Sequence, residues 1–238
     1  MSQLIVSEMF GPTIQGEGKY IGTPAIFLRL GGCNLGCVWC DSAYTWRFSD
    51  AKPHLFAPVY KRQHELFKKT DAELFQWAMG FAVRHLVITG GEPLLQQDRL
   101  IEFAAGLVSH GWTIEFETAG TISPDVDLPT RTKFTVSPKL ANSGNSLEER
   151  YKQDVLDDFA VRDSVFKFVV TCPGDFDEID TIVERSMLPR SHVYIMPEGT
   201  NAETLVLSMP ELIDCAIARG YNTTTRMHIL AWGNKRGV

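Results

Sequence analysis

The chain has 238 residues, 44% of them hydrophobic, which is enough to bury a sizeable core in one large domain or two small ones. Its net charge of −6 argues against a general affinity for nucleic acid, which needs clustered Lys and Arg. We see no signal peptide and no run of the ~20 apolar residues that span a bilayer, so we expect no membrane association and a cytoplasmic protein with mostly reduced thiols.

Apolar, β-branched runs recur along the chain and predict eight strands. Most of them are continuously apolar, as is typical of parallel strands that are covered on both faces. They span residues 4–10, 25–30, 85–90, 113–118, 133–138, 165–170, 192–197 and 226–232.

Helical stretches lie between these runs, and several carry clear start or stop signals. TDAE at 70–73 and SLEE at 146–149 are capping boxes, and the first opens a helix to about residue 81. Two further helices end at Gly111 and Gly220, and another covers 175–186. Strand–helix alternation at this spacing predicts an α/β fold with a parallel sheet. Roughly six units fit, so we expect an open partial (β/α)6 barrel, with a doubly wound sheet as the alternative, in a single domain over residues 1–238.

Residues 43–69 interrupt the alternation with Pro, aromatic residues and a basic cluster. We interpret them as a long loop, with room for a short helix near its end. Such loops are usually functional or mobile, while a solvated surface excursion is the alternative.

Three cysteines, Cys33, Cys37 and Cys40, lie within GGCNLGCVWCDS at 31–42. A structural zinc site needs four ligands, and neither a histidine nor another cysteine has suitable spacing. We expect Cys172 and Cys215 to be small core residues. Three soft thiolates suit an iron–sulfur cluster that keeps one iron open, and the neighbouring glycines allow the backbone to wrap around it.

CNLGCVWC resembles the C-x3-C-x2-C signature of the radical S-adenosylmethionine (SAM) superfamily. The resemblance implies a [4Fe-4S] cluster on the three cysteines and SAM on the fourth iron. It also implies an external one-electron donor, whose electron releases a 5′-deoxyadenosyl radical. Trp39 and Asp41, beside the last cysteine, are expected near SAM.

Polar motifs at successive strand ends support this resemblance, because parallel strand ends meet at one mouth. ITGGEP resembles the superfamily's SAM-ammonium element, VSPK resembles a SAM-contacting segment, and Glu117 of EFETAG is expected at a ribose or pterin edge, on the same strand face as Glu115. The SAM-binding residues implied are Gly90, Gly91, Glu92, Glu117, Ser137, Pro138 and Lys139. For Lys139, a solvated surface charge is the alternative.

FGPTIQGEGKYIGTPAIFLRLGGC at 10–33 resembles the 7-carboxy-7-deazaguanine synthase family, and with TGGEP, ET-x-G, VSPK and MPEG the likeness covers nearly the whole chain. The family converts 6-carboxy-5,6,7,8-tetrahydropterin to 7-carboxy-7-deazaguanine with loss of ammonia, on the route to queuosine and other deazapurines. It works as a homodimer with Mg²⁺, whose expected ligand here is Ser42 in place of the family's threonine. The implied substrate-binding residues are Ile14, Gln15, Gly16, Glu17, Arg29, Thr89 and His228.

Some of these roles have alternatives. Arg29 suits a substrate carboxylate or a structural ion pair with a neighbouring Glu, and His228 on its predicted strand is as compatible with a structural role. For the whole chain, the alternatives are a radical SAM activase acting on a partner protein, and a zinc- or cluster-binding regulatory module.

Overall fold

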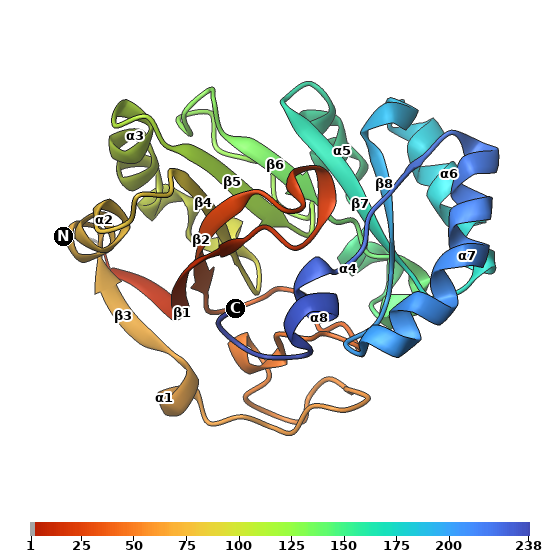
Figure 1. Cartoon of the computed structure of the whole chain (residues 1–238), viewed down its shortest axis with the longest axis horizontal. Coiled ribbons are helices and arrows are strands. Elements are labelled where there is room, and N and C mark those ends of the chain that lie inside the picture. The colour runs from red at the N-terminus through yellow and green to blue at the C-terminus, as the bar shows by residue number, and fades with distance from the viewer. Residues whose placement is uncertain (1–2) are drawn as a thin grey trace.

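A computed structural model describes residues 3–238 (Figure 1). Its nine strands form one sheet in the order β3-β1-β2-β4-β5-β6-β7-β8-β9. The strands are β1 (Gln3–Ile14), β2 (Pro24–Leu30), β3 (Phe67–Thr70), β4 (His85–Gly90), β5 (Thr113–Thr118), β6 (Lys133–Val136), β7 (Ser164–Val170), β8 (Val193–Pro197) and β9 (Asn222–Thr223). The helices are α1 (Arg62–Glu65), α2 (Asp71–Met79), α3 (Ile101–Ser109), α4 (Leu147–Arg150), α5 (Gln153–Ala160), α6 (Phe176–Arg185), α7 (Ala202–Arg219) and α8 (Met227–Trp232).

The sheet is an open partial barrel. Strands β2 and β4 to β9 run parallel, whereas β1 is antiparallel to both β2 and β3. Within residues 3–238 the edge strands β3 and β9 do not pair with each other, so the barrel does not close. Helices α2, α3, α5, α6 and α7 surround the curved sheet on its outer side (Figure 1). This confirms the expected fold class over the doubly wound alternative.

The main core lies between the sheet and these outer helices. Strand residues alternate between this core and the inside of the barrel: Phe116 packs in the core, whereas Glu115 and Glu117 share the opposite face of β5. On β7, Phe166 and Phe168 pack in the core and Lys167 between them points the other way. The concave side of the sheet is therefore polar, and it carries the site described below.

Both predicted capping boxes are present. The Thr70 hydroxyl accepts from the Glu73 amide at the start of α2, and Ser146 does the same for Glu149 at the start of α4. Gly220 ends α7 in the left-handed region, at φ +69°. Helix α7 begins at Ala202, earlier than the sequence pattern indicated, because Asn201 caps it.

The predicted strand over 226–232 is wrong, since α8 occupies these residues. In a short apolar run, hydrophobic periodicity cannot distinguish a buried strand from a short helix. Tertiary contacts decide the conformation here: the Met227 amide donates to the Gly16 carbonyl at 2.8 Å, which holds α8 against the turn after β1.

The long segment after the cysteines contains more regular structure than expected. It includes α1, the expected short helix, and also β3, which pairs antiparallel with β1 over Gln3–Val6. Among residues 3–238, no helix combines the length and apolarity needed to cross a membrane.

Candidate active site

A cavity of about 220 Å³ opens where the parallel strands end. The ends of β2, β4, β5, β6 and β8 line it together with β7, the cysteine loop, the turn after β1, and α8. It contains nearly every residue that the sequence indicated: Ile14, Gln15, Gly16, Glu17, Arg29, Cys33, Cys37, Trp39, Cys40, Asp41, Ser42, Thr89, Gly90, Gly91, Glu117, Ser137, Lys139 and His228.

Each thiol of the cysteine loop has an N–H group beside it. The Leu35 amide donates to Cys33 Sγ at 3.4 Å. The side chain of Asn145 donates to Cys37 Sγ at 3.3 Å, and the indole of Trp46 donates to Cys40 Sγ at 3.4 Å. Such donors stabilise negative charge on cysteine sulfur, whether as thiolate or as cluster ligand.

This donor set fits an iron–sulfur cluster better than a zinc ion. Within the described part of the chain, no three His, Cys, Asp or Glu side chains converge closely enough to hold a single metal ion. The three cysteines nevertheless line one cavity, as three corners of a larger cluster require. Burial raises the pKa of the Cys40 thiol to about 11, so the free thiol stays protonated at neutral pH and loses its proton on binding metal.

The turn after β4 packs directly on the cysteine loop. The Glu92 amide donates to the Gly32 carbonyl at 2.8 Å, and a Cβ on Gly91 would lie 1.9 Å from that same oxygen. Only glycine fits at such an approach. The glycines of TGGEP therefore set the position of the cysteine loop as well as leaving room for a ligand.

Glu92 lies outside the cavity wall, and its expected pairing with the SAM ammonium does not fit this arrangement. Its carboxylate is fully buried and accepts from the Leu94 amide, the Thr118 hydroxyl and the Ala119 amide at 2.7–3.0 Å. Burial raises its pKa despite these donors. We infer that Glu92 holds the end of β5 against the turn, which explains its place in the motif.

The segment after β6 reaches the cavity through Ser137 and Lys139, while Pro138 lies outside its lining. Lys139 Nζ donates to the carbonyl and hydroxyl oxygens of Ser137, both at 2.8 Å. Lys139 is therefore an ordered part of the wall and not a solvated surface charge. Trp39 is similarly fixed, since its indole donates to the Asn142 carbonyl at 3.0 Å.

A hydrogen-bonded group forms another part of the cavity wall. Glu117 accepts from Gln15 Nε2 at 3.1 Å and from the Thr89 hydroxyl at 2.8 Å. The Gln15 oxygen in turn accepts from the Glu17 amide at 3.2 Å. Burial raises the pKa of Glu117. Lys167 opposes this rise, and the nearby Glu17 and Glu115 add to it.

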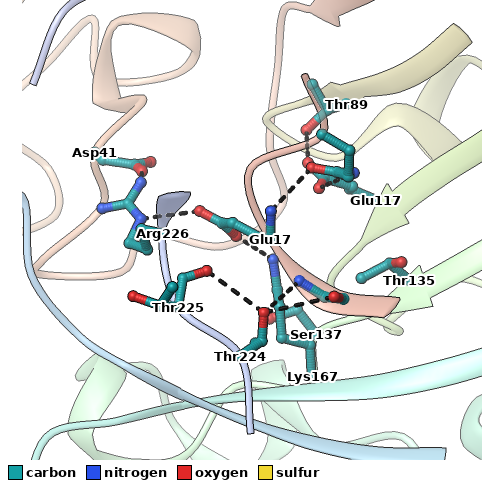
Figure 2. Close-up of polar contacts among 12 residues, drawn as sticks. Glu17, Asp41, Thr89, Glu117, Thr135, Ser137, Lys167, Thr224, Thr225 and Arg226 are labelled. Carbon is teal, nitrogen blue, oxygen red and sulfur yellow. Dashed lines mark hydrogen bonds and ion pairs between the residues drawn. The ribbon is translucent and has the colours of Figure 1, made fainter. Parts of the chain in front are cut away.

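Glu17 differs from Glu117 in its charge environment, although both line the same cavity. Lys167 from β7 and Arg226 before α8 form ion pairs with its two carboxylate oxygens (Figure 2). Burial alone would raise the pKa of Glu17, but these two cations outweigh it and hold the pKa well below its usual range. Glu17 is therefore a fixed, ionised acceptor.

Arg29 combines the two roles that the sequence left open. Its Nε donates to Glu8 at 2.8 Å, which is the structural ion pair, and the side chain also lines the cavity. Its Nη1 and Nη2 make no hydrogen bond to any residue in 3–238. The guanidinium thus keeps two donors for a ligand carboxylate.

Asp41, Ser42 and His228 complete the rim. Asp41 pairs with Arg226, and the Ser42 hydroxyl lies 3.7 Å from Cys40 Sγ. His228 is on α8 and not on a strand, and a Cβ on Gly16 would lie 2.0 Å from its Nδ1. Burial lowers the pKa of His228, so the ring is neutral at neutral pH.

Sequence reasoning missed four polar residues of this region. Lys167 had a readable signal, because it is an isolated Lys within the apolar run VFKFVV. No such signal marks Arg226, Asn145 and Trp46. They lie in segments that approach the site only in the folded protein. The expectation for Cys172 is also wrong: it is exposed in the turn after β7, whereas Cys215 is half-buried against the core.

The Radical SAM superfamily model matches residues 28–128, which include all three cysteines and the TGGEP turn. A 7-carboxy-7-deazaguanine synthase from Pyrobaculum aerophilum is 36% identical over 98% of this chain and 96% of its own length. The chain belongs to the 7-carboxy-7-deazaguanine synthase family. The synthase from Halobacterium salinarum is 32% identical over 97% of this chain and 91% of its own length.

The fold agrees with this family. The crystal structure of QueE from Escherichia coli superposes with a TM-score of 0.71 at 29% identity, covering 95% of each chain. As a member of a radical SAM family of synthases, the chain is an enzyme of the lyase class, and the superfamily implies a [4Fe-4S] cluster and SAM as its cofactors.

Proposed function

We propose that this enzyme converts 6-carboxy-5,6,7,8-tetrahydropterin to 7-carboxy-7-deazaguanine with loss of ammonia. The observation that carries the proposal is one cavity with two unlike walls. The three-cysteine loop forms one, and the other combines Gln15, Glu17, Glu117 and Arg29. A flat heterocycle bearing amide, amino and carboxylate groups matches the second wall in hydrogen-bonding character.

In this proposal, Cys33, Cys37 and Cys40 hold a [4Fe-4S] cluster. When bound, the cluster and SAM supply a carbon-centred radical that removes one hydrogen from the substrate. Trp39, Asp41, Gly90, Gly91, Ser137 and Lys139 line the part of the cavity where SAM is proposed to bind. Their ordered contacts favour a fixed geometry between radical and substrate, which limits unproductive reactions.

The substrate is proposed to bind against the second wall. Glu17 accepts from its amino groups, while Gln15 and the backbone of Ile14 and Gly16 complete the pairing at the pterin edge. The free Nη donors of Arg29 bind its carboxylate, and Thr89 and His228 flank the ring. Because His228 is neutral, it can offer either a donor or an acceptor there.

We also propose that Mg²⁺ binds beside Ser42. A hydroxyl oxygen suits this hard cation, and the substrate carboxylate and water would complete an octahedron that the protein does not supply alone. Ser42→Thr should keep Mg²⁺-dependent turnover and Ser42→Ala should lose most of it, as measured by titrating Mg²⁺ into chelator-treated enzyme. Equal behaviour of the two variants would exclude this role.

Three further properties of the enzyme, its domain organisation, its electron source and its oligomeric state, complete the proposal. Residues 1–238 act as one radical SAM domain, an external one-electron donor supplies the electron, and the enzyme functions as a homodimer. Light scattering of the reconstituted protein tests the last point, and a monomer at assay concentration would rule it out.

The deciding experiment is anaerobic turnover by reconstituted enzyme with SAM, reductant, Mg²⁺ and the carboxytetrahydropterin. We expect stoichiometric 7-carboxy-7-deazaguanine and ammonia; 5′-deoxyadenosine formed without consumption of the pterin would contradict the proposal.

Arg29→Met should lower kcat/KM by about 10- to 100-fold, because a hydrogen bond to a charged group contributes about 1.5–3 kcal/mol. Arg219→Met is the matched control, since Arg219 pairs with Asp180 away from the cavity.

A further inference from the structure

Two buried cations hold the Glu17 carboxylate from both sides. Lys167 contacts its Oε2, and Arg226 Nε donates to its Oε1 at 2.9 Å. Lys167 is 5% exposed and Arg226 is 7% exposed. Figure 2 shows Glu17 between the two, with Asp41 on the far side of Arg226. The carboxylate therefore has little freedom to rotate.

Arg226 also joins four segments that are distant in the chain. Its Nη1 donates to the Gly199 carbonyl after β8 at 2.7 Å, and its Nη2 pairs with Asp41 in the cysteine loop. Arg226 itself precedes α8, which carries His228. One guanidinium thus connects the Glu17 turn, the cysteine loop, the end of β8 and α8.

We propose that Lys167 and Arg226 are positioning residues: they fix the Glu17 carboxylate at the substrate wall and tie that wall to the cysteine loop through Asp41. The inference rests on the proposed function for the identity of the ligand that Glu17 receives. Lys167 and Arg226 lie outside the recognised motifs. According to this inference, they set the geometry of the contact between Glu17 and its ligand.

The placement of these charges favours positioning over simple stabilisation. A buried ion pair contributes little to stability compared with well-packed apolar residues, and Lys167 lies between Phe166 and Phe168 on an otherwise apolar strand. Nor does Lys167 suit proton delivery. Burial would lower its pKa, but Glu17 and Glu117 outweigh this and raise it, so the ammonium retains its proton.

The first test compares Lys167→Met with Glu17→Gln, and uses Lys133→Met as the control. Lys133 is also a β-strand lysine with an acidic partner, Asp163, but it lies outside the cavity. Lys167→Met should raise the KM for the carboxytetrahydropterin about tenfold or more with kcat changed much less, as expected for lost ground-state binding. SAM cleavage without pterin should stay within about twofold of wild type. Lys133→Met should leave KM unchanged.

The double variant Lys167→Met/Glu17→Gln decides whether Lys167 acts through Glu17. We expect its KM to be no higher than that of Glu17→Gln alone, because the effects of substitutions within one hydrogen-bonded network do not add. A KM for Lys167→Met equal to wild type, or additive effects in the double variant, would overturn the inference.

A thermal-unfolding cycle on the same variants separates this inference from the proposed function. If Lys167 positions Glu17, the melting temperature of the double variant should lie no lower than that of Lys167→Met. Should wild type make no deazaguanine product, the proposed function fails while this cycle still decides the positioning: coupled melting shifts support it, and additive shifts reject it.

Arg226→Met should, in addition, increase the 5′-deoxyadenosine formed per product, and an unchanged ratio would refute the link to the cysteine loop.

Discussion

At the scale of single residues, environment gives similar side chains different tasks. Glu17 and Glu117 line one cavity, yet two cations hold Glu17 ionised, whereas burial and neighbouring carboxylates raise the pKa of Glu117. The wall therefore presents a fixed negative acceptor beside a carboxyl group that protonates more readily. A substrate with both donor and acceptor edges can exploit this contrast.

Asn145 is the residue whose effect on the cluster is most directly testable. It accepts from the Gly36 amide at 2.9 Å and donates to Cys37 Sγ, so it bridges the backbone and a thiol of the cysteine loop. Losing a donor to sulfur removes stabilisation of the reduced cluster. Asn145→Ala should therefore lower the midpoint potential by on the order of tens of millivolts, measured by redox titration followed by EPR.

Asn142→Ala is the matched control for that titration. Its side-chain amide donates to the Val169 carbonyl and to Asp175, not to a thiol. The two variants should differ in potential although both lose a hydrogen-bonded side-chain amide. Equal potentials would mean that the Asn145 contact has no electronic role.

At the scale of elements, local signals in the sequence predicted helix starts well. Thr70 begins α2 with a reciprocal capping box, in which the Glu73 side chain accepts from the Thr70 amide at 2.8 Å. The box needs only residues three apart, so no tertiary information is required to recognise it. α8 is the contrary case, because its conformation depends on the Gly16 contact across the fold.

The cap of α2 provides a stability prediction. Thr70→Ala should lower the free energy of unfolding by about 1 kcal/mol, because the Glu73 amide loses its acceptor. Thr70→Ser keeps the hydroxyl and should retain most of that stability. Urea unfolding of both variants measures the difference, and indistinguishable midpoints would show that the cap contributes nothing.

At the scale of the whole molecule, Glu8 connects the antiparallel edge of the barrel to later parts of the chain. Its carboxylate accepts from Arg29 on β2, from the Tyr44 hydroxyl and from Arg236 near the C-terminus, each at 2.8 Å. Arg236 reaches on to Glu65 of α1 at 3.1 Å. This network holds the long segment after the cysteines against the open barrel.

The Glu8 network predicts acid sensitivity. Burial would raise the pKa of Glu8, but Arg29, Arg236 and Tyr44 outweigh it and lower the pKa below its usual 4.5. The unfolded chain then binds more protons, so the stabilisation is fully present above pH 4.5 and is lost as pH falls through the folded-state pKa. Unfolding measured from about pH 6 to about pH 3 should show a flatter curve for Glu8→Gln than for wild type. Parallel curves would contradict this.

The sequence by itself determined the strand–helix alternation, the capped helices and the cysteine loop with its glycines, because periodicity, caps and ligand spacing are local properties. It also placed most of the cavity wall, since parallel strand ends must meet at one edge. Only the tertiary structure decided that Glu92 supports β5 from behind the wall, that α8 is a helix, and that Arg226 and Asn145 reach the site. These depend on contacts between segments far apart in the chain, where burial and charge pairing outweigh local pattern.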